Sequence, residues 1–345
     1  MDISVIMPVY RVERYVKRCL ESVINQTYKG EVECIIINDC SPDRSLEIIE
    51  NVLSTYQGKI NFKILHHPKN LGSAQARNTG LKAAKGEYLI QVDSDDYFEE
   101  DMLLKMYNKA KLENADIVIA DYYLSFSDKE EYQRQILPSN KEDIFRRLIW
   151  CPYRNNFTRG MWNKLIKRSL YFDNDIYCYP NINYGEDLLV MLRIFGVAKK
   201  IEKIDEAFYH YVQYNISSYC SAINYGNMMN RIDAIKIIDD FISEKQIECN
   251  KAFAFEKLSS KSYILFGTSG KLQCQYTSLY KEVDEYISPF LSETNHSLYW
   301  KLAYRFGLRG NLFVFNLMRG FWRLLRNRSE RLVNEDDIIE YVRSN

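Results

Sequence analysis

The sequence predicts an α/β fold in which a mostly parallel sheet is flanked by helices and followed by a C-terminal helical extension. Short β-branched runs alternate with helix-periodic segments up to about residue 125, as is typical of parallel strands joined by crossover helices. The alternation then fades, and helical periodicity dominates from residue 230 onward. With 345 residues, 46% of them hydrophobic, the chain can bury a full core. We therefore expect three parts, at residues 1–125, 126–224 and 225–345.

The first part begins with a β-branched strand at residues 3–7, followed by apolar residues at helical spacing over 15–26. A second buried strand at 34–37 precedes Ser41-Pro42, which predicts a helix N-cap with proline at the first helical position. The remaining expected elements are strands at 62–65, 88–92 and 117–119 and helices at 74–84 and 102–112. Strands and helices in this order imply a parallel sheet covered on both faces.

Ligands of such sheets bind beyond the carboxyl ends of the strands, where the strand order reverses. Tyr10, Asp39 and Asp93 each follow a predicted strand at that end. Three segments far apart in the sequence are therefore expected to meet in one crevice.

Composition excludes some classes of function. The chain has 46 basic and 46 acidic residues, so no global field recruits nucleic acid. The eight cysteines form no C-x-x-C pair, which favours reduced thiols in a cytoplasmic protein. No signal peptide opens the chain, and no stretch approaches the roughly 18 apolar residues of a membrane-spanning helix. We expect a soluble or peripheral protein.

The acidic segment Asp93-Ser94-Asp95-Asp96 places three carboxylates directly after an apolar strand. Such a cluster suits Mg²⁺ or Mn²⁺, which bind through a few carboxylates together with substrate phosphates. A solvated acidic turn that caps the next helix is the alternative, and the motif alone does not decide between them. The G-x-G-x-x-G fingerprint and the phosphate loop G-x-x-x-x-G-K-S/T are both absent, so a diphosphate would have to be held through a metal.

Several further motifs occur together with this one, in a fixed order. They are Pro8-Val9-Tyr10, Asn38-Asp39-Cys40-Ser41-Pro42-Asp43, Asn70-Leu71-Gly72, Ala76-Arg77-Asn78-Thr79-Gly80 and Gly86-Glu87-Tyr88. In this order they resemble glycosyltransferase family 2, the nucleotide-sugar enzymes of the GT-A fold, over about the first 120 residues. Asn38 and Cys40 stand where relatives usually carry Asp and Gly, which leaves the choice of nucleotide open.

The resemblance implies a donor site in the first part of the chain. Pro8, Val9 and Tyr10 would line the base and ribose pocket, and Asp39 would accept a hydrogen bond from the ring N–H of a uracil-like base. Arg77 would contact the base or the diphosphate; the alternative is a helix-surface arginine paired with a nearby acid.

The resemblance also assigns the acidic motif. Asp93 would belong to the ribose or metal shell, Asp95 would reach a Mn²⁺ or Mg²⁺ ion, and Asp96 would support it as part of the metal site. His210, a lone histidine among aromatics, is interpreted as a structural residue.

A catalytic base is expected well after the metal motif. Glu186 and Asp187 open an apolar helix-periodic segment, where acids also interact well with the helix dipole without any catalytic role. The resemblance implies that Asp187 is the base and Glu186 orients it. It further implies an acceptor-binding loop at Trp162, Asn163 and Lys164, with a core position for Trp162 as the alternative.

Residues 298–327 contain several lysines and arginines, no acid, and many aromatic residues. Arg319, Arg323 and Arg326 would share one helical face, with Leu317, Phe321, Leu324 and Leu325 on another. A basic amphipathic helix on anionic lipid explains this pattern, and so does a helix packed on the catalytic domain with a solvated arginine rim. The spacing leaves both open.

Together these patterns predict a metal-dependent, inverting glycosyltransferase, in cell-surface polysaccharide synthesis. The donor would be a nucleoside diphosphate sugar, with UDP-sugar the first expectation, and the acceptor a hydroxyl of a saccharide or lipid-linked saccharide. The alternatives are a catalytically silent scaffold of GT-A fold and a sugar nucleotidyltransferase. We expect a cytoplasmic protein without nucleic-acid partners, and the sequence leaves open a peripheral position on the inner face of the plasma membrane. It does not predict the sugar, the linkage or the oligomeric state.

Overall fold

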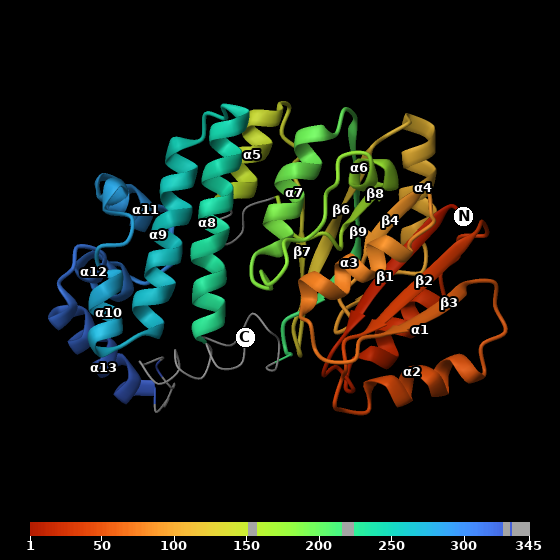
Figure 1. The fold of residues 1–345 in the computed structure, drawn as a ribbon, viewed down its shortest axis with the longest axis horizontal. Coiled ribbons are helices and arrows are strands. Elements are labelled where there is room, and N and C mark those ends of the chain that lie inside the picture. The colour runs from red at the N-terminus through yellow and green to blue at the C-terminus, as the bar shows by residue number, and fades with distance from the viewer. Residues whose placement is uncertain (151–156, 216–223, 327–331, 333–345) are drawn as a thin grey trace. The chain divides into compact units, whose positions relative to one another are not determined.

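The structure is a computed structural model that describes residues 1–150, 157–215, 224–326 and 332 (Figure 1). The chain divides into two compact units. Unit 1 comprises Met1–Ile144 and Asn156–Ile216, and unit 2 comprises Phe145–Asn155 and Ser217–Asn345. Most of the predicted parts 1–125 and 126–224 belongs to unit 1, and most of 225–345 belongs to unit 2. The functional division of the chain into these three parts remains a prediction.

Unit 1 is built on a nine-stranded sheet in the order β3-β2-β1-β4-β8-β6-β9-β5, with β7 paired to β6. The strands are β1 (Ile3–Val9), β2 (Val32–Asn38), β3 (Asn61–His66), β4 (Tyr88–Gln91), β5 (Tyr97–Phe98), β6 (Ile117–Ser125), β7 (Glu130–Gln133), β8 (Lys164–Lys167) and β9 (Ile201–Val212). The strands β3, β2, β1 and β4 are mutually parallel. This half of the sheet confirms the predicted alternation.

Helices cover both faces of the parallel half. The helices of unit 1 are α1 (Val16–Ile24), α2 (Ser45–Ser54), α3 (Ser73–Ala83), α4 (Met102–Glu113), α6 (Arg168–Phe172) and α7 (Glu186–Val197), and α5 (Lys141–Ile149) crosses the boundary between the units. Val5 and Met7 of β1 pack in one core with buried residues of α1 and α4. On the opposite face α3 lies close to the sheet, since a Cβ at Gly80 would fall 2.4 Å from Ile6 Cγ2. A glycine is needed at this contact.

The second half of the sheet differs from a continued β-α alternation. β8 enters antiparallel between β4 and β6, and the twelve-residue β9 runs parallel to β6 with a register shift near Asp121. The sequence predicted only a short piece of β6 and none of β7, β8 and β9. The fold is α/β with a mixed rather than wholly parallel sheet.

The helix after β2 begins later than expected. Its first residue is Ser45, whereas Ser41-Pro42 was the predicted start. The Ser41 hydroxyl accepts a hydrogen bond from the Arg11 backbone N–H and donates to Asp43, so it ties two loops together instead of capping a helix. The predicted N-cap is therefore wrong.

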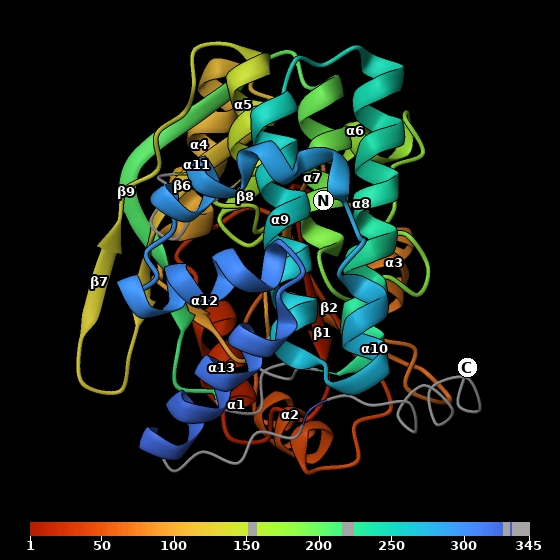
Figure 2. The same ribbon diagram turned by 90° about the vertical axis from the view of Figure 1, so that its left-hand side faces the viewer.

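Unit 2 is helical, as predicted for the C-terminal part (Figure 2). Its elements are α8 (Tyr225–Lys245), α9 (Asn250–Gly267), α10 (Gly270–Tyr276), the 3₁₀ helix η2 (Lys281–Tyr286), α11 (Ile287–Glu293), α12 (Leu298–Leu308) and α13 (Leu312–Arg326). Phe255 and Leu258 of α9 share a core with Phe290 of α11, Ala303 of α12 and Phe315 of α13. In the described part of the chain no helix is both long and apolar enough to span a membrane.

Candidate active site

Three strand ends meet where the sequence predicted a crevice. Val9, the last residue of β1, pairs with Asn38 at the end of β2, and the Asp39 N–H donates to the Val9 carbonyl at 3.0 Å. On the other side of β1, the Val92 N–H donates to the Ile6 carbonyl at 2.9 Å. The segments after β1, β2 and β4 are therefore neighbours, as expected.

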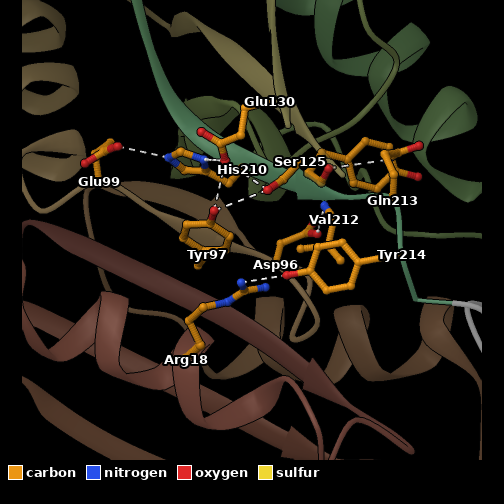
Figure 3. A network of polar contacts seen from close by, with 11 residues as sticks. Arg18, Asp96, Tyr97, Glu99, Ser125, Glu130, His210, Val212, Gln213 and Tyr214 are labelled. Atoms are coloured by element: carbon orange, nitrogen blue, oxygen red, sulfur yellow. Dashed lines mark hydrogen bonds and ion pairs between the residues drawn. The ribbon is translucent and has the colours of Figure 1, made fainter. Parts of the chain in front are cut away.

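Both carboxylate oxygens of Asp96 accept hydrogen bonds from protein groups. Its Oδ1 accepts from the Val212 N–H at 2.7 Å (Figure 3). Its Oδ2 accepts from the Tyr209 hydroxyl at 2.8 Å. The residue is 1% exposed, and burial, together with the charges of Asp95 and Asp93, raises its pKa. The Tyr209 hydroxyl also accepts from the Asp93 N–H at 3.0 Å, so one residue of β9 fixes both ends of the acidic motif.

Asp95 keeps a carboxylate oxygen available. Its Oδ2 accepts from Asn215 Nδ2 at 2.7 Å. Within the described ranges, no side chain of another residue donates to its Oδ1. Burial and the charge of Asp93 raise the pKa of Asp95. A bound cation would relieve this repulsion.

The acidic motif fits a metal diphosphate better than an all-protein metal site. Among the residues that the structure describes, no group of three or more His, Cys, Asp or Glu is arranged to hold a metal ion. Mg²⁺ and similar ions need only one or two carboxylates when waters and phosphates complete their shell. Asp95, with Asp93 beside it, satisfies that requirement, whereas both oxygens of Asp96 are already used.

His210 lies on β9 next to Tyr209 and has its own set of partners (Figure 3). Its Nδ1 and Nε2 are 2.7 Å from Glu130 Oε1 and 2.9 Å from Glu99 Oε1. Its ring stacks between Tyr97 and Tyr123, at centroid distances of 4.3 and 4.8 Å. These contacts support the structural interpretation of His210.

Asp39 is buried and holds a loop. It is 2% exposed, its carboxylate accepts from the backbone N–H groups of Leu71 and Gly72 at 2.8 and 2.9 Å, and His67 Nδ1 lies 2.6 Å from Oδ1. A nucleotide base would have to share this carboxylate with three protein donors. The contact of Asp39 with a uracil-like base remains a prediction.

Arg77 connects the metal motif to the predicted catalytic pair. Its Nη2 donates to Asp93 Oδ1 at 2.6 Å, its Nη1 to Gln91 Oε1 at 3.1 Å, and its Nε lies 3.8 Å from Glu186 Oε1. The side chain is 7% exposed. Arg77 is therefore paired with acids, as one alternative held, but in the interior and not on a helix surface.

Glu186 and Asp187 form the first turn of α7, whose N-cap Gly185 has a φ of 87°, a left-handed conformation that favours glycine. Ser73 Oγ donates to Glu186 Oε1 at 3.0 Å. Burial raises the pKa of both carboxyls; for Glu186 the charge of Asp187 adds to the effect, and for Asp187 the positive charge of Arg77 opposes it. Asp187 Oδ1 is buried without a hydrogen-bond partner in the described structure.

The predicted acceptor segment is buried next to Tyr209, the residue that contacts Asp96. Trp162 is 5% exposed and stacks on Tyr209 at a centroid distance of 4.6 Å, and Asn163 and Lys164 are also buried. The Lys164 ammonium donates to the carbonyls of Thr158 and Gly160. Burial raises the pKa of Asp187, and the charge of Lys164 partly opposes this rise. This placement favours a core tryptophan, the alternative left open above, and a supporting role for Lys164.

The first three predicted donor residues differ in exposure. Val9 is fully buried, Pro8 is half-buried, and Tyr10 is 38% exposed at the end of β1. Of the three, Tyr10 presents the largest surface to a ligand. Pocket-lining by Pro8 and Val9 remains a prediction.

Residues 4–178, just over half of the chain, match the family model described as Glycosyl transferase family 2. The chain belongs to this family. A cholesterol galactosyltransferase of Borreliella burgdorferi is 34% identical over 217 residues, which are 60% of this chain and 59% of that protein. The uncharacterized glycosyltransferase EpsJ of Bacillus subtilis is 32% identical over 213 residues, 61% of this chain and 60% of that protein.

The fold also matches a solved structure. Residues 1–349 of TarS from Staphylococcus aureus, solved in complex with UDP-GlcNAc, superpose with a TM-score of 0.62 at 19% identity, covering 96% of this chain and 93% of that one. The predicted GT-A fold of this family 2 chain is therefore confirmed. The chain spans about 60% of the length of the first two relatives above.

Sequence reasoning missed several residues of the candidate site. Tyr209, which fixes Asp96, and Asn215, which contacts Asp95, lie more than a hundred residues from the acidic motif. The aromatic and β-branched run Phe208-Tyr209-His210-Tyr211-Val212 was the available signal, since such runs predict a strand. Ser73, the partner of Glu186, carried no local signal of its own.

Proposed function

We propose that the chain is an inverting glycosyltransferase that moves a sugar from a UDP-sugar to a hydroxyl of a saccharide or lipid-linked saccharide. The observation that carries this proposal is the connection between the two acidic segments. Arg77 contacts Asp93 after β4 and approaches Glu186 at the start of α7, beside Asp187 with its unpartnered oxygen. A donor-side carboxylate and a base are thus adjacent in one interior site.

The residues support a single displacement. The acceptor oxygen attacks the anomeric carbon while the bond from that carbon to the diphosphate oxygen breaks, and Asp187 takes the proton of the attacking hydroxyl. Burial disfavours the ionised form of Asp187, so the proton is accepted readily. Glu186 and Lys164 position this carboxylate, and the nucleoside diphosphate leaves with the electron pair.

The donor side would use Mn²⁺ or Mg²⁺ at Asp95, with Asp93 close by. A divalent ion there would neutralise charge that develops on the departing diphosphate. Asp96 would hold the motif in place through Tyr209 and Val212. Within the predicted base pocket, Tyr10 would offer its exposed aromatic ring to the nucleotide. Asp39 would contribute to nucleotide binding through the loop that it holds at Gly72.

The acceptor is the least defined part of the proposal. TarS is named as a poly(ribitol-phosphate) β-N-acetylglucosaminyltransferase, and the Borreliella relative as a cholesterol galactosyltransferase. These names support glycan synthesis for the cell surface but not one acceptor class. A cytoplasmic enzyme that works peripherally at the inner membrane face would suit a lipid-linked acceptor.

Release of UDP from UDP-sugars with Mn²⁺ tests the proposal. We expect turnover by the wild type, a loss of at least about a hundredfold in Asp95→Ala and in Asp187→Asn, and wild-type rates in Asp173→Asn, an exposed carboxylate at the end of α6. Equal rates in all four proteins, or no release with any donor, would favour the silent scaffold.

A further inference from the structure

The last two described helices present apolar side chains to solvent. Leu298, Leu302 and Phe306 repeat every fourth residue on α12, and Phe313, Leu317 and Phe321 do so on α13; these six side chains are 38% to 79% exposed. Residues four apart share a helix face. Each helix thus carries an outward apolar stripe, while Ala303, Leu308 and Phe315 face the core.

The orientation of α13 differs from that of a helix packed with its arginines in solvent: Arg319 is buried, and Leu317 and Phe321 are exposed. Arg319 is 5% exposed, and its Nη1 donates to the carbonyls of Leu265, Phe266 and Thr268 at the end of α9. A buried arginine that satisfies these carbonyls fixes the rotation of α13 about its axis. The opposite face, with Leu317 and Phe321, must then point outward.

The charged residues within α12, α13 and their connection have one sign. From Leu298 to Arg326 the sequence has six basic residues and no acid. Arg305 and Arg309 are exposed near the C-terminal end of α12; Arg305 directly precedes Phe306, and Arg309 lies between the two stripes in the sequence. Elsewhere in the described residues, exposed large apolar side chains occur singly, as at Leu112 on α4, or as one pair, Tyr132 and Ile136.

We infer that α12 and α13 form a docking surface for an anionic lipid bilayer, called here the α12–α13 surface and consisting of the six apolar residues with Arg305 and Arg309. Apolar side chains beside basic ones, with no acid, match the interface between acyl chains and negatively charged headgroups. A symmetric contact with a second copy would bring the same basic residues together and repel. The helices would lie in the plane of the bilayer surface.

Sedimentation of the full chain with vesicles tests this inference. We expect the protein to pellet with phosphatidylglycerol vesicles at low salt, to remain in solution with phosphatidylcholine vesicles, and to dissociate at high salt. Phe313→Ser with Phe321→Ser should weaken binding at least about tenfold, because two aromatic side chains no longer enter the bilayer. Leu112→Ser, at a site 81% exposed, is the matched control and should bind as the wild type does.

A charge-reversal variant and its control test the inference without changing any apolar side chain. Arg305→Glu with Arg309→Glu should also weaken binding by on the order of tenfold or more, whereas Lys236→Glu, 68% exposed on α8, should not. Failure of the wild type to pellet with phosphatidylglycerol, or equal binding by all variants, would overturn the inference. So would a concentration-dependent dimer in sedimentation velocity that the serine variants abolish. No donor is present in these assays, so their outcome is independent of glycosyl transfer.

Discussion

The acidic motif after β4 and the Glu186-Asp187 pair both bring carboxylates into the interior, but the protein satisfies them differently. Asp96 receives hydrogen bonds on both oxygens, from Val212 and Tyr209. Asp187 has a buried oxygen without a hydrogen-bond partner in the described structure. Burial raises the pKa of both groups, so the shift in pKa alone does not separate them.

The difference lies in what remains to be bound. A buried polar atom without a partner costs about 1–3 kcal/mol, and a fold retains such an atom most readily where a ligand or a proton is to be bound there. Asp96 has no such capacity left and holds the motif together. Asp187 has it, at the start of a helix that Arg77 connects to Asp93. The comparison supports our proposal that Asp96 is a structural acid and Asp187 a reactive one.

Substitution of the reactive pair should have the largest effect. Asp187→Asn removes the proton acceptor and keeps the size of the side chain, so we expect transfer to fall by about a hundredfold to ten-thousandfold. Glu186→Gln should lose less, because it positions the base and does not take the proton. Initial rates of transfer with donor and acceptor measure the loss in each variant. A larger loss in Glu186→Gln than in Asp187→Asn would make Glu186 the proton acceptor and Asp187 the positioning residue.

The pH profile should show the same base. Asp187 must be ionised to accept a proton, and its pKa is raised by burial. Activity should therefore be full above this raised pKa and fall about tenfold per pH unit below it, starting at a higher pH than the value of about 4 for an ordinary aspartate. Thermal melts over the same range exclude acid unfolding. An acid limb that survives in the residual activity of Asp187→Asn would contradict the assignment.

Asp96→Asn should affect stability before chemistry. The amide cannot accept on both sides, so the bond from Val212 or from Tyr209 is lost, which should lower the free energy of unfolding by about 1–3 kcal/mol. Tyr209→Phe removes the hydroxyl that donates to Asp96 and accepts from the Asp93 N–H, so it should lower the free energy of unfolding by a comparable amount. Chemical denaturation checks this, and unchanged stability in both variants would mean that Asp96 is not the structural acid of the motif.

The smallest effect is expected at His210. Phe in its place preserves stacking between Tyr97 and Tyr123 and loses the bonds to Glu99 and Glu130. We expect a loss of about 1 kcal/mol in stability and an unchanged dependence of the rate on Mn²⁺ concentration. A weakened Mn²⁺ dependence would place His210 in the metal site instead.

Local patterns predicted the parallel half of the sheet because its strands and helices are consecutive and each has its own periodicity. They did not predict β8, which enters antiparallel between β4 and β6, because this pairing depends on the whole sheet. The same limit applies to Trp162: an indole can lie on a sugar or on Tyr209, and only the tertiary structure chooses. Asp187 and Arg77 were predicted from motifs, whereas their connection through Asp93 required the fold.

The cysteines show a related limit. The six described cysteines are free thiols, while Cys151 and Cys220 lie outside the described residues, so the expectation of reduced thiols remains a prediction for the whole chain. A pattern without C-x-x-C pairs could exclude common metal and redox motifs. It could not place individual thiols such as Cys19, whose Sγ lies 3.5 Å from the Asp93 carbonyl.

A crystal structure of the full chain with UDP and Mn²⁺ tests the central claim most directly. The account predicts anomalous density for the ion at about the 2.1 Å metal–oxygen distance from Asp95, with the diphosphate on its other side and Asp96 still bound to Tyr209. Two results would contradict it: nucleotide bound elsewhere, or an ion that is bound by Asp96 in place of Tyr209 and makes no contact with Asp95.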